Sequence, residues 1–406
     1  MTGRGSISHT ATLLLWVLAG GRCEYHGCNA YLLEDDVTSF ELNLADRAHI
    51  VGATDAPGSP RGDDPLALDE RNAAENLMLL CRAHHRLIDQ RIDEHPVSEL
   101  RRMKREHEAR IRLLTGLQDD AATVVVRAVG GIRGAPVEVP RDAVLAAVRA
   151  DRRFPRYPLA LAGEDLEIDL RGLPNESDPT YWQTGAAIIA EQAARIRDAR
   201  TPVRHISVFA ITRIPLLVAL GFHLDDKIPT TVYGRRRDGT GDNGWGFDPD
   251  AEPVQFDVQH IAGPIDSPRV ALAVSVTAPI AEEVASAVGP EHAVYELAPV
   301  AAARGRKLLG ARISLDHFAD AYHQFLGRTE AEHAACDVID LFAAVPVTGA
   351  VQLGRGVMRD VQPALRVHDR GSDGVFHEAL VLGRHAATCD GMTCAARTLP
   401  PAGLRR

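Results

Sequence analysis

The sequence predicts two unlike domains: a small α+β domain that binds metal, followed by a larger α/β domain. Three cysteines, Cys23, Cys28 and Cys81, stand among histidines near the start of the chain. From about residue 181 onward, continuous apolar runs typical of buried strands alternate with helical patterns, which favours a mostly parallel sheet. A chain of 406 residues also exceeds what one ordinary core organises. We place the first domain at residues 1–116, a connecting segment that begins the second domain at 117–175, and the second domain at 176–406.

The composition is that of a soluble globular protein. Hydrophobic residues make up 45% of the chain and charged residues 25%, which excludes a disordered or fibrous protein. The six cysteines lack the pattern of an extracellular disulfide framework, so we expect a cytoplasmic protein. The apolar run at residues 11–19 resembles a secretory signal, but Cys23 follows it closely, and we favour an amphipathic first helix. This run is far shorter than the roughly 20 residues that span a bilayer, so no membrane partner is expected.

The pattern along the chain predicts the order of the elements. In the first domain we expect a helix, a cysteine-containing turn, a β-like region at 38–51, a helix after Cys81 and a final helix from about residue 96. In the second domain, strands are expected at 122–128, 166–170, 204–211, 270–276, 293–297 and 338–344. Helices are expected at 141–152, 181–197, 215–220, 280–288, 315–327 and from about 349. Parallel sheets of this kind bind ligands in the crevice outside the carboxyl ends of their strands.

Four residues between positions 49 and 89 have the spacing of a phosphodiester-cleaving site. His49 ends an apolar strand, Asn76 follows much later, and His85 and Asp89 lie one turn apart on the next helix. Hydrolysis needs a divalent cation on the scissile phosphate and a neutral imidazole that takes a proton from water. We assign His49 as the base and Asn76 as the residue that fixes its loop. His85 is assigned as a magnesium ligand, and Asp89 binds or braces the same ion. This is the layout of an HNH (ββα-metal) nuclease.

The cysteines around this motif have the spacing of a structural zinc site. The candidate ligands are Cys23, Cys28, Cys81 and His84. Four residues separate the members of the first pair, and two residues separate the members of the second. Three thiolates and one imidazole make a closed tetrahedral set, and a fold this small gains much of its stability from such an ion. We choose His84 because its gap matches a zinc knuckle, while His85 and His26 remain contenders.

Both domains resemble a known family. The first is similar to the HNH domain of the CBASS anti-phage effectors at residues 21–23, 47–51 (Arg-Ala-His-Ile-Val), 59–63 and 76–89. The second is similar to their SAVED domain, which is related to two fused CARF-type sensor folds. That similarity lies at residues 205–210, 214–216, 220–221, 233–245 and 341–354.

The resemblance implies a nuclease that stays inactive until a cyclic oligonucleotide second messenger docks in the SAVED domain. A homodimer would then assemble into a higher oligomer and degrade double-stranded DNA with little sequence preference. The resemblance favours a cyclic dinucleotide over a cyclic trinucleotide. One position departs from the family pattern, because many HNH sites place an acidic residue or a second histidine directly before the base, where this chain has Ala48. Asp46 or Asp89 would then complete the magnesium shell.

A pocket for such a messenger needs guanidinium groups for its phosphates and aromatic faces for its bases. Residues 233–245 supply both on a glycine-rich backbone, although an exposed hairpin with Trp245 as a packing residue fits the same pattern. Three polar residues that follow apolar strands would face the same crevice. The candidate ligand-binding residues are Arg213, Tyr233, Arg235, Trp245, Thr277 and Thr348.

The net charge of −10 is unusual for a DNA-binding protein and leaves other functions open. Basic residues concentrate at 101–112, where they form either a solvated helix face or a surface that tracks phosphates. One alternative is a restriction-type HNH nuclease whose second domain recognises modified DNA, which a basic second half would favour. Another is a non-enzymatic zinc-finger regulator, in which His49 and His85 have no catalytic role.

Overall fold

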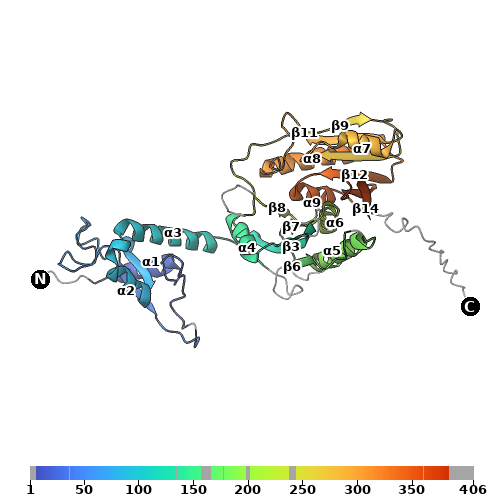
Figure 1. The fold of residues 1–406 in the computed structure, drawn as a ribbon. Coiled ribbons are helices and arrows are strands. Elements are labelled where there is room, and N and C mark those ends of the chain that lie inside the picture. The colour runs from blue at the N-terminus through green and yellow to red at the C-terminus, as the bar shows by residue number, and fades with distance from the viewer. Residues whose placement is uncertain are drawn as a thin grey trace, which may run out of the picture. The chain divides into compact units, whose positions relative to one another are not determined.

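The chain folds into two compact units, Met1–Gln118 and Asp119–Arg406 (Figure 1). The structure is a computed structural model that describes residues 6–35, 37–132, 135–156, 166–176, 178–197, 202–236, 244–359 and 361–383. Over these ranges, no helix has both the length and the apolarity that crossing a bilayer requires. Each unit has a buried apolar core of its own.

The first unit is a short antiparallel ribbon packed against three helices. Its elements are α1 (His9–Ala19), β1 (Ala45–His49), β2 (Leu77–Cys81), α2 (Arg82–Gln90) and α3 (Val97–Thr115). The first four residues of β2 are buried, and they form the core with side chains from all three helices. In the register of the ribbon, Cys81 lies opposite Ala45 and Leu77 lies opposite His49. Cys81, an expected zinc ligand, and His49, the expected base, therefore lie at opposite ends of the ribbon.

The first sheet of the second unit is built around β3 (Ala122–Ile132). This strand pairs in parallel with β7 (Ile206–Ile211) and β6 (Leu166–Leu170), and β7 pairs in parallel with β8 (Thr230–Tyr233). The two-residue strands β4 (Ala135–Pro136) and β5 (Phe154–Pro155) pair with the two ends of β3. One face of the sheet packs on α4 (Arg141–Ala150), and the other on α5 (Tyr181–Arg197) and α6 (Ile214–Leu224).

The second sheet has the strand order β14-β13-β12-β10-β11-β9. Its central strands are parallel: β10 (Val270–Ser275), β11 (Ala293–Pro299), β12 (Val338–Ala344) and β13 (Ala364–Arg370). The edge strands β9 (Phe256–Ala262) and β14 (Phe376–Leu382) pair antiparallel to their neighbours. One face packs on α7 (Ala281–Val288), and the other shares its core with α8 (Arg312–Glu332) and α9 (Val347–Arg355).

Helices α6 and α9 cross at two glycines. A Cβ atom added at Gly221 would lie 1.9 Å from the Val351 carbonyl oxygen, and one added at Gly354 would lie 1.9 Å from the Val218 carbonyl oxygen. The contact is reciprocal. Gly221 lies three residues after Val218 on α6, and Gly354 lies three residues after Val351 on α9, so each helix presents one valine carbonyl to the glycine of the other. The two strand–helix segments, β7–α6 and β12–α9, therefore contact each other through equivalent positions of their helices.

We expect Gly221→Ala to destabilise the second unit. The new methyl group would meet backbone atoms that cannot turn aside, so helices must separate, and overpacking of this kind costs roughly 1–3 kcal/mol. The matched control is Gly327→Ala on α8, where an added Cβ would meet nothing within 4 Å. That change should be neutral or stabilise the helix by up to about 1 kcal/mol. Urea unfolding of both full-length variants measures the difference, and equal midpoints would contradict the assigned close crossing.

Candidate metal centre and ligand cavity

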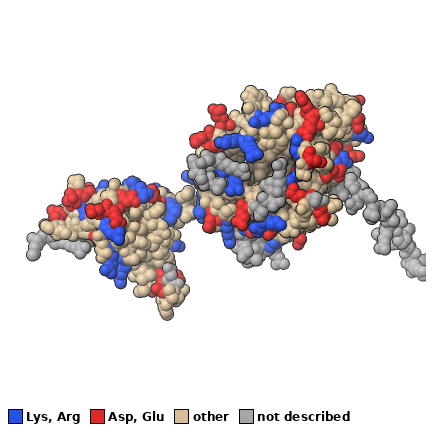
Figure 2. Space-filling view, in the orientation of Figure 1, with Lys and Arg blue, Asp and Glu red and all other residues tan. Residues whose placement is uncertain are grey.

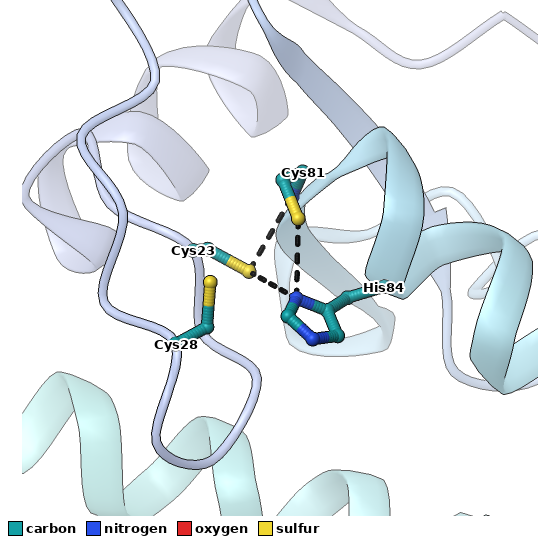
Figure 3. Close-up of side chains that lie close together, drawn as sticks. All are labelled: Cys23, Cys28, Cys81 and His84. Atoms are coloured by element: carbon teal, nitrogen blue, oxygen red, sulfur yellow. Dashed lines mark hydrogen bonds between the residues drawn. The ribbon is translucent and has the colours of Figure 1, made fainter. Parts of the chain in front are cut away.

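Three thiols and one imidazole converge in the first unit. The ligand atoms of Cys23, Cys28, Cys81 and His84 all lie within 4.8 Å of one another (Figure 3). The Nδ1 atom of His84 is 3.1 Å from the Cys81 sulfur and 3.7 Å from the Cys23 sulfur. This donor set is the one that structural zinc prefers, so the residues fit the ion. The cluster contains His84 and contains neither of the two contending histidines.

Two elements bring the four side chains together. Cys23 and Cys28 lie on the turn that follows α1. Cys81 ends β2, and His84 lies in the first turn of α2 (Figure 3). Glu24 ties the turn to β2, since its buried carboxylate accepts a 2.6 Å hydrogen bond from the Leu79 N–H. The Tyr25 ring stacks on His84 with centroids 4.2 Å apart. Burial raises the pKa of the Cys23 thiol to about 12 and that of Glu24 to about 7, while it lowers the pKa of His84.

Asn76 clamps the chain that follows the expected base. Its side-chain oxygen accepts a 2.9 Å hydrogen bond from the Val51 N–H, and its amide nitrogen donates to the Val51 and Arg71 carbonyls at 2.8 Å. His49 ends β1 two residues earlier, and its Nε2 atom lies 3.0 Å from the Asn72 side-chain oxygen. Asn76 therefore braces the loop after His49 through these hydrogen bonds. The structure also adds Asn72 as the direct partner of the imidazole.

His85 lies between two carboxylates. Its Nδ1 atom is 3.1 Å from the Asp46 side chain on β1, and its Nε2 atom is 3.4 Å from the Asp89 side chain one turn along α2. The two carboxylates thus contact opposite sides of one ring. All three side chains are about one-third exposed, which leaves this group open to solvent. Ala48 is fully buried, so the position directly before the base supplies packing rather than a ligand.

Two buried arginines that were not assigned a role from the sequence hold the loop between β1 and β2. Arg61 donates to the carbonyls of Ile50 at 2.6 Å and Ile88 at 2.8 Å, and it pairs with Asp89 at 3.1 Å. Arg71 donates instead to four backbone carbonyls at residues 52, 62, 64 and 66. Desolvation lowers the pKa of Arg61, although Asp89 opposes the shift. Both arginines lie in a loop, where an exposed residue is the ordinary assumption.

The basic residues of α3 are partly engaged with acidic residues of the same helix. Arg102 donates to both Glu99 and Glu106, and Lys104 pairs with Glu108 at 2.6 Å. On the face shown in Figure 2, basic and acidic side chains are interspersed over both units. The exposed Arg102 fits the solvated-face interpretation, whereas Lys104 is buried in the first unit.

A cavity of about 1280 Å³ lies at the carboxyl ends of strands in the first sheet. Gly131 of β3, Leu170 of β6 and Arg213 just after β7 line one side. The opposite side is the end of β13 and the turn into β14, at residues 369–374. The cavity therefore lies between the two sheets, at the kind of crevice in which α/β proteins bind ligands.

Cations, anions and aromatic rings share this cavity. Its lining includes Arg171, Arg213, Arg370, Glu176, Asp369, Asp373, Tyr181 and Trp182. Arg213 is the most enclosed of the three arginines, and it bridges Glu176 and Asp369. Burial raises the pKa of Asp369, although the Arg213 charge opposes the shift. Trp182 is half-buried and packs edge-on against Tyr181 with ring centroids 4.7 Å apart. The sequence did not single out Trp182 because it lies on a helix with other apolar residues.

The other expected ligand-binding residues do not line this cavity. Tyr233 and Trp245 are buried and pack on Phe209, with centroids 4.4 and 5.4 Å away, so these aromatic faces serve the core. Arg235 is exposed and pairs with Trp245 in a β-bridge, and Thr348 is buried beside Gly234. Thr277 is half-buried, and its N–H donates to the Ala344 carbonyl. Arg237 and residues 241–243 of the expected loop lie outside the described residues.

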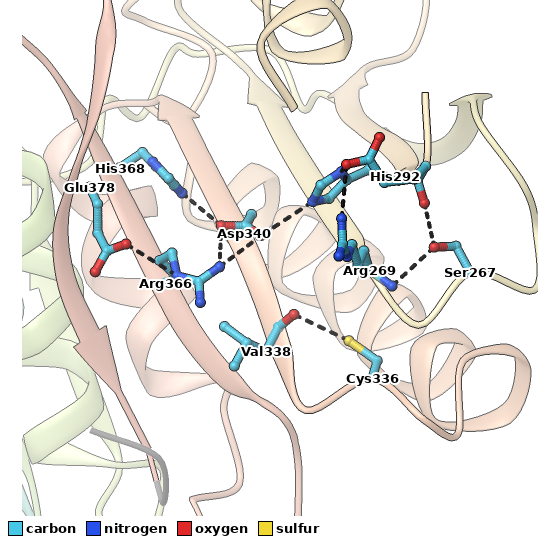
Figure 4. A network of polar contacts seen from close by, with 10 residues as sticks. Ser267, Arg269, His292, Cys336, Val338, Asp340, Arg366, His368 and Glu378 are labelled. Carbon is cyan, nitrogen blue, oxygen red and sulfur yellow. Dashed lines mark hydrogen bonds and ion pairs between the residues drawn. The ribbon is translucent and has the colours of Figure 1, made fainter. Parts of the chain in front are cut away.

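A further polar network crosses the second sheet (Figure 4). Asp340 on β12 contacts His368 at 2.8 Å and Arg366 at 3.2 Å, both on β13, and lies 3.8 Å from His292. Burial acts to raise the pKa of Asp340, but the hydrogen bond from His368 and the Arg366 charge outweigh it and lower the pKa. These contacts satisfy a carboxylate in the middle of a sheet, which is a structural role.

The second unit is an α/β domain of two sheets with a cavity between them. Residues 189–382 match the SAVED family, described as the SMODS-associated and fused to various effectors sensor domain. The match covers slightly less than half of the chain, and it supports the predicted SAVED-type α/β fold for this segment. A search of curated proteins found no match.

Solved structures of Cap4 SAVED/CARF-domain containing receptors are also similar to the chain. The Acinetobacter baumannii receptor with the cyclic trinucleotide 3'3'3'-cAAA is 11% identical, with a TM-score of 0.45 over 75% of this chain and 63% of that chain. The same receptor with 2'3'3'-cAAA is 10% identical, with a TM-score of 0.43 over 75% and 62%. The Moraxella osloensis receptor is 11% identical, with a TM-score of 0.38 over 79% and 71%. This chain thus spans less than two thirds of the A. baumannii receptor.

Loss of one ligand should empty the Cys/His cluster. We expect Cys81→Ser to remove bound zinc and to cost the first unit at least about 2 kcal/mol, which lowers the Tm of a domain of this size by roughly 10 °C. Elemental analysis and differential scanning calorimetry measure both effects. His26→Ala is the control, because His26 is exposed and lies outside the cluster. Unchanged zinc content in Cys81→Ser would refute the ligand assignment.

Proposed function

We propose that the chain is a metal-dependent DNA endonuclease gated by a cyclic oligonucleotide. The observation that carries the nuclease proposal is the setting of His85. It stands between Asp46 and Asp89 on a helix that begins at the Cys/His cluster, in a ββα unit whose first strand ends at His49. The SAVED match over residues 189–382 carries the sensor proposal.

His49 is the proposed base. Its Nε2 atom lies 3.0 Å from the Asn72 side-chain oxygen, and an amide oxygen only accepts hydrogen bonds, so we assign an Nε2 proton to His49. That tautomer leaves Nδ1 as the basic nitrogen, which would take a proton from the attacking water. Asn76 forms hydrogen bonds with the backbone of Val51, two residues after His49, and so fixes the backbone that carries the His49 ring.

His85 and a neighbouring carboxylate are the proposed ligands of a divalent cation, Mg²⁺ or Mn²⁺. One imidazole with two accessible carboxylates fits such an ion, which accepts oxygen and nitrogen donors. The ion would neutralise charge on the scissile phosphate and on the departing oxygen. The Cys/His cluster, in contrast, has no open position and would serve the fold.

The proposed messenger site is the cavity at Arg213. Three arginines suit the phosphates of a cyclic oligonucleotide, and the half-buried Trp182 offers an aromatic face to a base. We propose a cyclic dinucleotide as the ligand, with cyclic trinucleotides as the competing class. Messenger binding would promote assembly of homodimers into higher oligomers and so activate cleavage of double-stranded DNA in anti-phage defence.

The alternatives predict different behaviour. A restriction-type enzyme would use the second unit to recognise modified DNA, whereas residues 189–382 match a sensor family. A zinc-finger regulator would bind DNA without cutting it. A plasmid assay with magnesium, with and without each of a panel of cyclic di- and trinucleotides, separates these functions.

His49→Ala should abolish cleavage. Removal of a general base typically costs about 100-fold or more in rate, while the zinc cluster and the second unit should keep their stability. The measurement is the rate of plasmid nicking with magnesium and the most active messenger of the panel. His26→Ala is the matched exposed histidine and should cut at the wild-type rate. Cleavage at an undiminished rate by His49→Ala would exclude the base assignment.

Trp182→Ala should weaken messenger binding. Loss of one base–aromatic stack costs about 1–3 kcal/mol, so we expect the Kd to rise roughly tenfold or more. Calorimetric titration of the full-length variant measures this value. Arg235→Ala is the comparison, because Arg235 is exposed and lies outside the cavity lining. Normal binding by Trp182→Ala with loss in Arg235→Ala would move the messenger site to the neighbourhood of Arg235.

A further inference from the structure

Two exposed arginines lie on the face of α2 that carries His85. Residues 82, 85, 86 and 89 fall within one arc of about 100° around the helix, because successive helical residues are about 100° apart. This arc carries Arg82, His85, Arg86 and Asp89. Ile88, which lies outside the arc, is buried in the core of the first unit. Both arginines therefore face solvent next to the proposed cleavage site.

The nearby carboxylates are engaged with other groups. Asp46 on β1 contacts His85 at 3.1 Å, and Asp89 contacts Arg61 at 3.1 Å and His85 at 3.4 Å. Within the described part of the first unit, neither exposed arginine of α2 forms an ion pair. Their guanidinium groups, which suit phosphate through a planar array of donors, are thus available to an anion from outside the chain.

The proposed cleavage site needs accessible positive charge from its surroundings. Asp46 and Asp89 place two carboxylates beside His85, and these oppose the approach of DNA phosphates. Arg61 offsets Asp89, but it is 5% exposed and donates to backbone carbonyls, so DNA cannot reach it. A divalent cation would act on the scissile phosphate, which leaves the neighbouring phosphates to side chains on the solvent face of α2.

We infer that Arg82 and Arg86 bind the DNA phosphates that neighbour the one to be cleaved. The two residues lie about 6 Å apart along the helix axis, since each residue rises about 1.5 Å. One DNA strand carries a phosphate about every 3.4 Å of duplex axis, so a strand that crosses His85 offers phosphates at comparable distances. Such contacts position the backbone and read no base. This inference rests on the proposed nuclease function and adds residues that hold its substrate.

The exposed arginines of α3 form the competing surface. The contacts of this helix lead to α1 and to the turn that follows it. The Nε2 atom of His107 lies 2.9 Å from the Ala19 carbonyl oxygen, and Arg110 donates to the Asn29 side chain at 2.6 Å. His85 instead contacts β1, and its own helix carries the two arginines one turn or less away. We therefore assign the phosphates nearest to His85 to α2 and not to α3.

The test is the salt dependence of DNA binding by the full-length protein. Fluorescence anisotropy follows a labelled short duplex without added divalent cation, at about 50–200 mM salt and with protein up to about 100 µM. Each phosphate contact contributes about 0.9 to the slope of log K against log salt. We expect the double variant Arg82→Gln/Arg86→Gln to lose about 2 from the magnitude of this slope. Binding should weaken equally on two duplexes of unrelated sequence, as for phosphate contacts.

Arg101→Gln/Arg105→Gln is the matched control. It removes two exposed arginines with the same four-residue spacing from another helix of the same unit, so the change in net charge is identical. The slope should stay at the wild-type value. Because all four side chains are exposed, both variants should also keep the wild-type Tm, which shows that the fold is intact.

The outcomes separate this inference from the nuclease proposal. An equal loss of slope in both double variants, or a greater loss in the α3 variant, overturns the assignment even if the protein cuts plasmid with magnesium. Wild-type protein that binds no DNA at the lowest salt concentration also overturns it. The expected order of slopes in a protein that cuts no plasmid upholds the phosphate contacts and removes the nuclease function.

Discussion

The second unit depends on the close approach of α6 and α9. A side chain at Gly221 or Gly354 would collide with the backbone of the opposite helix, so only glycine allows this crossing. Each helix directly follows a central strand of one sheet, and the crossing therefore fixes the separation of the two sheets. That separation sets the cavity between them, and the Arg213–Asp369 ion pair joins the two halves at its wall. An anion that bound Arg213 would compete with Asp369 and so act on the junction itself.

The first unit is held together in a different way, because its apolar core is small and its buried polar groups are many. The start of α2 is tied to the cysteine turn by the Cys/His cluster, and its last turn is tied to β1 by Arg61. His85 stands between these two attachments. A lysine could not replace Arg61, since a single ammonium lacks the planar array of donors that reaches three carbonyls and a carboxylate at once. The Arg61 guanidinium here supplies rigidity that a larger core provides elsewhere, and an ion held by the proposed Cys/His site would add to it.

The sequence predicted the central strands that form continuous buried runs and missed three other strands of the second sheet. β7, β10 and β12 are continuous apolar runs, and all three were expected. β9 and β14 alternate with charged and polar residues because they are edge strands, and β13 ends in His-Asp-Arg at the cavity, so none of these three was expected. Spacing alone predicted the cysteine cluster, although three histidines competed for its fourth position. It did not identify Arg61 or Trp182, whose roles depend on contacts between segments distant in sequence.

Charge constrains how the proposed nuclease holds DNA. Affinity for DNA comes mainly from cations that neutralise phosphates, yet the chain carries a net charge of −10, and some cations of α3 are engaged with its own carboxylates. A single copy of the protein with this net charge gains little binding free energy from each DNA phosphate that it contacts. When several copies of the protein are linked, each DNA contact raises the effective concentration for the next, so weak contacts together give a high overall affinity for DNA. Assembly driven by a messenger would thus increase DNA binding without any change at His49 or His85, which is why sensing and cutting can reside in separately folded units.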